Sequence, residues 1–145
     1  MNIIITGATG FVGKNLSKFL KEKGHHILPL SLRKAWELDQ NAEAIIHLAG
    51  KAHDTKNISI EKEYFEINTE LTKKLFDEFL NTAAQDFIYF SSVKAAADTV
   101  EGFLDENHKS NPQTPYGKSK LLAEEYLLSQ KLPENKRLFI IRPCM

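Results

Sequence analysis

Short runs of apolar residues alternate along this chain with longer stretches in which apolar side chains recur every three or four residues. The short runs are rich in β-branched or aromatic residues and stop at polar or turn-forming ones, which is typical of buried parallel strands. They cover residues 3–5, 26–32, 44–49, 87–90 and 137–142. The helical period covers residues 11–22, 60–80 and 115–130. This order predicts an α/β fold, a Rossmann-like doubly wound parallel sheet with right-handed crossovers.

Some segments depart from a regular strand and helix alternation. Pro29 withholds a backbone donor inside the second strand, which we therefore expect to be short or irregular. Residues 33–43 are too few for a full crossover helix and are predicted to be mostly loop, and residues 50–61 are a polar loop. Thr114 followed by Pro115 predicts the capped start of the last helix.

A glycine-rich turn follows the first strand. Gly7, Gly10 and Gly13 stand between this strand and the helix that opens at Phe11. In such a turn the three glycines serve a sharp reversal, close approach of the backbone to a pyrophosphate, and tight contact of helix and strand. The helix N-terminus adds free N–H groups and the positive end of its dipole. The turn predicts a dinucleotide site, although an ordinary strand-turn-helix can also carry such glycines.

Composition narrows the classes of function. The 145 residues fit one domain, and 19 basic residues balance 19 acidic ones, so no overall field favours nucleic acid or an anionic membrane. The single cysteine, Cys144, cannot form an internal disulfide, and neither a signal-peptide core nor a membrane-spanning run is present. No histidine has partners at a metal-ligand spacing. We expect a cytoplasmic protein without a metal site, a nucleic-acid partner or a membrane partner.

Three residues carry candidate catalytic chemistry. Tyr116 and Lys120 lie four residues apart near the start of a helix, so their side chains share one face. The lysine ammonium would stabilise a tyrosine phenolate, and the positive ring of an oxidised nicotinamide would add to that effect. Ser92, at the end of the fourth strand, is placed to donate a hydrogen bond to the same substrate oxygen, whereas Ser91 is predicted to be a turn residue. The tyrosine and lysine pair taken alone also fits a solvated helix face.

Together these pieces resemble the extended short-chain dehydrogenase/reductase family, of the NAD-dependent epimerase/dehydratase type that modifies nucleotide sugars. The matching segments span the whole chain in the family's order. They are residues 6–13 (TGATGFVG), 47–50 (HLAG), 66–69 (EINT), 90–92 (FSS) and 112–120 (PQTPYGKSK), with Glu124 and with Arg142-Pro143. The resemblance implies hydride transfer between a sugar carbon and a nicotinamide, with Ser92, Tyr116 and Lys120 as the catalytic triad and Tyr116 as the acid and base.

The resemblance also implies which residues hold the cofactor. Those expected at the pyrophosphate are Gly7, Gly10, Phe11, Val12 and Gly13; those on the adenosine and ribose side are Leu48, Ala49 and Gly50. Asn68 would steady the active-site helix, Lys120 would also grip the nicotinamide ribose, and Pro143 closes the rim.

The choice between NAD and NADP depends on the end of the second strand. Family members that prefer NAD usually carry an acidic residue there, and this chain has none. Ser31 and Arg33 would instead accept a 2′-phosphate, so the sequence leans towards NADP; the alternative is that Arg33 is an ordinary loop cation. The short connection after this strand also weakens the expected adenine pocket.

Several functions stay open at this point. A simple NAD(P)H-dependent ketosugar reductase would use the same residues as an epimerase or dehydratase. A non-catalytic dinucleotide sensor or scaffold would typically have lost the tyrosine or the lysine, and this chain keeps both. Residues 1–145 are expected to be an NAD(P)-binding domain that stops before a C-terminal substrate lobe, so that the piece by itself would be poorly active. The apolar helices near 60–80 and 115–130 are expected to pair in a homodimer.

Overall fold

The computed structural model describes residues 1–51, 61–100 and 102–144. In this part of the chain five parallel strands form one sheet in the order β2-β1-β3-β4-β5. The strands are β1 (Asn2–Thr6), β2 (His26–Leu30), β3 (Ala44–His47), β4 (Asp86–Phe90) and β5 (Arg137–Ile141). This sheet confirms the predicted Rossmann-like fold.

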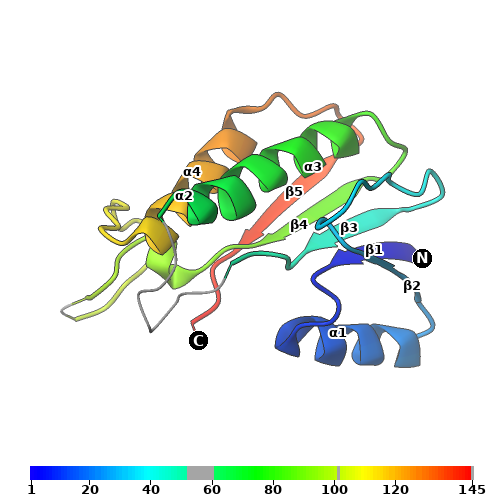
Figure 1. The fold of residues 1–145 in the computed structure, drawn as a ribbon, viewed down its shortest axis with the longest axis horizontal. Helices are drawn as coiled ribbons and strands as arrows, with labels where there is room; N and C mark the ends of the chain where they lie inside the picture. Colours follow the sequence, from blue (N-terminus) through cyan, green and yellow to red (C-terminus); the bar gives the residue numbers. More distant parts are fainter. Residues whose placement is uncertain (52–60, 101, 145) are drawn as a thin grey trace.

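Helices cover the two faces of the sheet unequally. Helix α1 (Phe11–Glu22) lies on one face, and α2 (Glu61–Tyr64), α3 (Leu71–Leu80) and α4 (Pro115–Ser129) lie on the other (Figure 1). A π-helical segment, Phe65–Glu70, joins α2 to α3, and a 3₁₀ turn, Val93–Ala95, follows β4. The polar loop predicted over residues 50–61 falls mainly on residues 52–60, which lie outside the described part.

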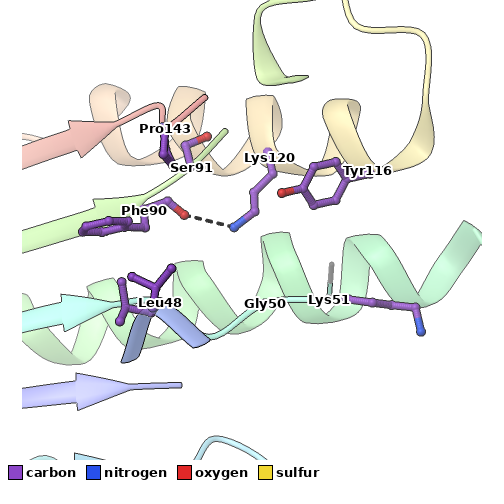
Figure 2. A pocket seen from close by; sticks show the side chains of 9 residues that line it. Leu48, Gly50, Lys51, Phe90, Ser91, Tyr116, Lys120 and Pro143 are labelled. Atoms are coloured by element: carbon purple, nitrogen blue, oxygen red, sulfur yellow. Dashed lines mark hydrogen bonds between the residues drawn. The ribbon is translucent and has the colours of Figure 1, made fainter. Parts of the chain in front are cut away.

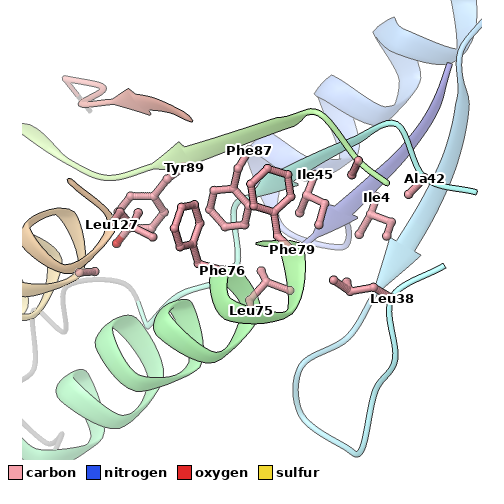
Figure 3. Packing of buried hydrophobic residues seen from close by; sticks show 12 residues of the cluster. Ile4, Leu38, Ala42, Ile45, Leu75, Phe76, Phe79, Phe87, Tyr89 and Leu127 are labelled. Carbon is pink, nitrogen blue, oxygen red and sulfur yellow. The ribbon is translucent and has the colours of Figure 1, made fainter. Parts of the chain in front are cut away.

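The larger apolar core lies between the sheet and helices α3 and α4. Phe87 of β4 packs edge-on against Phe76 of α3, with 5.0 Å between ring centroids and 84° between the ring planes. Phe79 lies 5.2 Å from the same ring, and Tyr89 and Leu127 extend the cluster towards α4 (Figure 3). Aromatic rings at these distances attract one another beyond the area they bury. This packing anchors both helices that reach the functional edge of the sheet.

A loop, and not a helix, connects β2 to β3. Leu38 and Ala42 of this loop are buried and pack in the same core as Ile4 and Ile45. The loop therefore covers part of the sheet that a crossover helix would otherwise cover, and the prediction that residues 33–43 are mostly loop is confirmed.

The strand order locates the crevice in which such sheets bind ligands. β2 and β3 lie on opposite sides of β1, so the chain changes direction across the sheet between β1 and β3. Open α/β sheets bind ligands at this switch point, outside the carboxyl ends of the strands. Pro29 pairs with Ile5 in regular register, and because β2 is an edge strand the missing donor is tolerated. The second strand is thus short, as expected, but regular.

Candidate active site

A cavity of about 160 Å³ opens at the carboxyl ends of the strands, between the first turn of α1 and the first turns of α4 (Figure 2). Its lining residues come from helices α1 and α4, from the end of β4 and the residue after it, and from the segments that follow β3 and β5. They are Val12, Leu48, Gly50, Lys51, Phe90, Ser91, Tyr116, Lys120 and Pro143. Clefts that enclose a whole ligand usually have about 300–1,000 Å³. This cavity is therefore too small to enclose a whole ligand of that size, and only one part of a longer ligand would enter it.

The backbone around the glycine turn leaves no room for a side chain at Gly7 or Gly13. Gly7 has a φ of +70°, and a Cβ there would lie 2.8 Å from the backbone nitrogen of Ala49. A Cβ on Gly13 would lie 2.2 Å from the carbonyl oxygen of Gly7. At Gly10 the nearest atom within the protein is the Gly7 oxygen at 3.3 Å, so a side chain there would meet the protein far less severely. Gly7 and Gly13 thus shape the turn, and Gly10 leaves its outer side accessible to a ligand.

The segment after β3 forms the cavity wall opposite α4, and Asn68 of the π-helical segment holds it. The Lys51 backbone nitrogen donates to Asn68 Oδ1 at 2.7 Å, and Asn68 Nδ2 donates to the Lys51 oxygen at 3.2 Å and to Ser119 Oγ of α4 at 3.1 Å. A Cβ on Gly50 would lie 2.9 Å from Asn68 Oδ1 and 3.2 Å from Lys120 Nζ. The predicted role of Asn68 next to the active-site helix has a direct geometric basis in these contacts.

Lys120 is held on the cavity side of α4. Its Nζ donates to the Phe90 carbonyl oxygen at 3.1 Å (Figure 2). The same atom lies 4.9 Å from the centre of the Tyr89 ring. Burial lowers the pKa of Lys120 to about 8, with the charge of Glu124 opposing the shift. Tyr116 directs its hydroxyl towards this lysine and the open cavity. The two side chains therefore meet in one cavity, as the four-residue spacing predicts.

A clamp of hydrogen bonds fixes the start of α4 and with it Tyr116. Thr114 caps the helix by accepting a hydrogen bond from the Gly117 nitrogen at 3.2 Å, which confirms the predicted cap. Thr114 Oγ1 in turn donates to Asp98 Oδ1 at 2.6 Å, and the backbone nitrogens of Gln113 and Thr114 donate to Asp98 Oδ2. Desolvation opposes the shift, but these hydrogen bonds lower the pKa of Asp98. The anionic form of Asp98 is the one that holds the turn.

A buried ion pair fixes the other side of α4. The Glu124 carboxylate is almost fully buried and accepts from Arg142 Nε at 3.0 and 3.1 Å and from its terminal nitrogen at 2.5 Å. The Arg142 side chain also donates to Ser110 Oγ at 3.3 Å. Paired, planar contacts of this kind fix orientation as well as distance. Pro143, the next residue, thereby reaches the cavity.

Of the two serines after β4, Ser91 and not Ser92 lines the cavity. Ser91, predicted to be a turn residue, lines the cavity; it is buried, and its Oγ has no hydrogen-bond partner within the protein. Ser92, predicted to be catalytic, does not line the cavity, and its Oγ accepts from the Lys94 nitrogen at 3.2 Å at the start of the 3₁₀ turn. Because an extended strand sends successive side chains to opposite sides, only one of two adjacent serines faces the cavity here.

The structure brings together part of the predicted set. Val12, Leu48, Gly50, Tyr116, Lys120 and Pro143 line the cavity. Gly7, Gly10 and Gly13 form the turn before and at the start of α1, Ala49 lies between two lining residues, and Asn68 binds the backbone of Lys51. Phe11 is exposed, and Ser31 and Arg33 are not cavity-lining residues. Lys51, Phe90 and Ser91 were not predicted as site residues. These three residues could have been found from the sequence by their position at or just after the ends of strands, because the carboxyl ends of parallel strands meet at one edge of the sheet.

In residues 1–51, 61–100 and 102–144, no helix is long and apolar enough to cross a membrane. The same residues contain no group of three or more His, Cys, Asp or Glu side chains that could hold a metal ion.

The doubly wound sheet with a glycine turn at its switch point is the architecture of a Rossmann-like domain. The model of the NAD dependent epimerase/dehydratase family matches residues 3–145. The chain belongs to this family.

Individual relatives fit the same family. The chain is 30% identical to a UDP-glucose 4-epimerase of Vibrio cholerae, over 99% of this chain and 51% of that protein. It is 34% identical to a UDP-2-acetamido-2,6-beta-L-arabino-hexul-4-ose reductase of Pseudomonas aeruginosa, over 88% and 31% of the two chains. The solved structure of RMD from Pseudomonas aeruginosa complexed with NADPH superposes with a TM-score of 0.78 at 26% identity, over 98% and 52%. The chain thus spans about half of these relatives, or less.

Proposed function

We propose that this chain is the cofactor-binding and catalytic half of an NAD(P)-dependent enzyme that acts on a nucleotide sugar. The observation that carries the proposal is the meeting of Tyr116 and Lys120 in one cavity beside a glycine turn that keeps side chains away from its surface. The family and its relatives, which include an epimerase and a reductase of nucleotide sugars, support it. Residues 1–145 would supply the cofactor domain, and a substrate lobe would complete the enzyme.

The residues present fit a nicotinamide dinucleotide. The glycine turn and Val12 would hold its pyrophosphate, Leu48 and Gly50 would line its ribose side, and Lys120 would grip the ribose next to the nicotinamide. When bound, the cofactor would supply the acceptor or donor of a hydride. The cavity is lined by Leu48, Phe90 and Pro143, which would keep water from the reacting atoms.

Tyr116 would transfer the proton of the reaction. Its hydroxyl faces the cavity, where a sugar hydroxyl beside the nicotinamide would lie. Oxidation of that hydroxyl to a ketone releases a proton to the Tyr116 phenolate as hydride leaves the same carbon, and reduction returns both. Lys120 would stabilise the phenolate by its charge, which is present below its pKa of about 8. Ser92 stays a predicted member of the triad.

Epimerase or dehydratase activity is our first proposal and ketosugar reduction is the second, which is favoured by the identity of 34% to a reductase. An NMR assay distinguishes them in the complete protein that carries this chain. Incubation of UDP-hexoses with catalytic NAD⁺ should produce the 4-epimer or a dehydrated 4-ketosugar, whereas a reductase would consume NADPH in proportion to a ketosugar. Absence of any conversion with either cofactor would contradict both.

We also propose that NADP(H) binds more tightly than NAD(H). Both Ser31 and Arg33 follow the edge strand β2 and are exposed, and no carboxylate stands at the end of this strand. Arg33→Ala should weaken binding of NADPH by about tenfold, the equivalent of one charged contact, and leave NADH unchanged. Calorimetric titration of both cofactors measures this. Equal loss for the two cofactors, or none for NADPH, would contradict the role of Arg33.

Pairing of two copies through the helices near 60–80 and 115–130 remains a proposal. Leu122 and Leu128 of α4 are 44% and 69% exposed, which leaves apolar area on the outer side of this helix. Two-fold pairing would bury such area. Sedimentation equilibrium should then show a dimer that the double change Leu122→Glu and Leu128→Glu converts to a monomer, and a wild-type monomer at all concentrations would contradict it.

A further inference from the structure

His47, at the end of β3, is fully buried and hydrogen-bonded through both ring nitrogens. Thr6 Oγ1 of β1 lies 2.6 Å from Nδ1, and Thr72 Oγ1 of α3 lies 2.8 Å from Nε2. The ring stacks on Tyr89 with 5.6 Å between centroids. The histidine therefore bridges the first strand and the helix layer behind the cavity wall.

The neighbouring hydrogen bonds determine which ring nitrogen of His47 donates and which accepts. The Thr72 hydroxyl has one proton and donates it to the Asn68 carbonyl oxygen at 2.8 Å, so His47 Nε2 must carry a proton and donate to Thr72. Nδ1 is then the acceptor and Thr6 the donor. Thr6 Oγ1 in turn accepts from the Ala49 backbone nitrogen at 3.1 Å. The chain of hydrogen bonds runs in one direction from Ala49 to Asn68.

The two ends of this series of hydrogen bonds both hold the segment formed by residues 48–51. Ala49 lies inside residues 48–51, and Asn68 binds the backbone of Lys51 through its side chain. Leu48, Gly50 and Lys51 of this segment line the cavity. The segment is thus tied at one end to β1 and at the other to the helix layer, with His47 between them.

The surroundings of His47 keep its ring neutral. Burial lowers the pKa of His47 to about 3, and the charge of Lys120 adds to this effect. The other titratable side chain against the ring is Tyr89, whose pKa burial raises, so it is uncharged. A charged imidazolium would also leave Thr6 without an acceptor. A neutral ring with its proton on Nε2 is the form that satisfies every contact.

We propose that His47 is a positioning residue, which acts as the neutral Nε2–H tautomer to set the backbone of residues 48–51 against the bound cofactor. This inference rests on the proposed function for its effect on cofactor affinity. The geometry of the bridge, however, exists without a cofactor and is testable without one.

The first measurement is a long-range ¹H–¹⁵N NMR spectrum of the uniformly labelled chain without cofactor. We expect the His47 signals of the Nε2–H tautomer, unchanged between pH 7 and pH 5, because its pKa of about 3 lies below this range. Its proton on Nδ1, or titration within that range, would overturn the proposal.

The second measurement uses Thr6→Val, which keeps the β-branched shape of the strand residue and removes its hydroxyl. Amide hydrogen exchange at Ala49 should become about tenfold faster and NADPH binding about tenfold weaker, as expected for loss of one hydrogen bond. Thr6→Ser should restore both. Thr72→Val breaks the other end of the bridge and gives a second test if Thr6→Val does not fold.

Thr82→Val is the matched control. Thr82 Oγ1 also accepts from a backbone nitrogen, that of Ala84 at 3.3 Å, and donates to the Phe79 oxygen at 2.8 Å, but it lies beyond the end of α3 and not at the cavity. The variant Thr82→Val should leave amide exchange at Ala49 and NADPH affinity unchanged. Exchange and affinity in Thr6→Val equal to wild type would overturn the proposal. If wild-type protein binds no cofactor, the proposed function fails, and the tautomer and Ala49 exchange alone decide the positioning role.

Discussion

Replacing Tyr116 by phenylalanine should reduce kcat by about 10²–10⁴-fold, measured with the proposed substrate lobe present, which is the usual contribution of a positioned acid or base. The change removes the hydroxyl that faces the cavity and keeps the ring. The edge-on contact of that ring with Tyr64, at 6.2 Å and 71°, does not need the hydroxyl. Cofactor affinity and the melting temperature should therefore stay close to wild type, as measured by calorimetry and thermal unfolding.

Tyr126→Phe is the matched control for this experiment. Tyr126 lies on the same helix and its hydroxyl donates to Asp77 Oδ1 at 2.7 Å, away from the cavity. Tyr126→Phe removes a hydroxyl from a tyrosine of α4, as Tyr116→Phe does, and should leave turnover unchanged. Full turnover by Tyr116→Phe would rule out Tyr116 as the proton-transfer residue.

Gly13→Ala should damage both the fold and the cofactor site. The new Cβ would lie 2.2 Å from the Gly7 oxygen and 2.7 Å from the Ala8 Cα, and both are backbone atoms that cannot rotate away. Helix α1 must therefore move from the turn. We expect a loss of about 3 kcal/mol in the free energy of unfolding, the upper end for overpacking, and loss of measurable NADPH binding. Urea unfolding and calorimetry measure the two effects.

Gly24→Ala separates this clash from the general effect of losing a glycine. Gly24 has a φ of +82°, and a Cβ there would have no neighbour within 4 Å. The variant should be destabilised by about 1 kcal/mol through its backbone conformation alone. Its cofactor binding should match wild type. Equal damage from the two alanines would contradict the specific packing of the turn.

The sequence predicted the strands and helices well because each buried segment carries a strong periodic signal. The isoleucines of β1 and the aromatic residues of β4 alternate between the two faces of the sheet, and their runs stop at polar residues. The π-helical segment, Phe65–Glu70, was not predicted, because the apolar residues there still fit one continuous helix. Its position depends on contacts of Asn68 and Thr69 with α4 that are distant in sequence.

The candidate site was predicted where the chemistry is local and missed where it depends on how the chain turns in space. The spacing of Tyr116 and Lys120 was sufficient to place both in the cavity. The choice between Ser91 and Ser92 depends on how far the extended backbone of β4 continues. Pairing continues past Phe90 through the hydrogen bond from the Ser91 nitrogen to the Ile141 oxygen, a residue distant in sequence. Lys51 enters the wall through its backbone contacts with Asn68, which no motif in the sequence shows.

The hydrogen bonds of His47 could not be predicted from the sequence either. The sequence shows a lone histidine at a strand end, without partners at a metal-ligand spacing. Its two threonine partners are 41 and 25 residues away, so only the folded chain shows that both ring nitrogens are bonded. Burial keeps the ring of His47 neutral, and the hydrogen bonds at its two ring nitrogens select the tautomer.

In the proposed complex, a nicotinamide dinucleotide lies across the glycine turn with its reactive end beside Tyr116 and Lys120. Titration of the ¹⁵N-labelled chain with NADP⁺ and with NAD⁺, followed in ¹H–¹⁵N correlation spectra, tests it most directly. We predict saturable shifts of the backbone amides of Gly7, Gly10, Gly13, Gly50 and Ser91 with one common affinity for each cofactor. Unchanged spectra with both cofactors, or shifts confined to amides away from this edge of the sheet, would contradict the account.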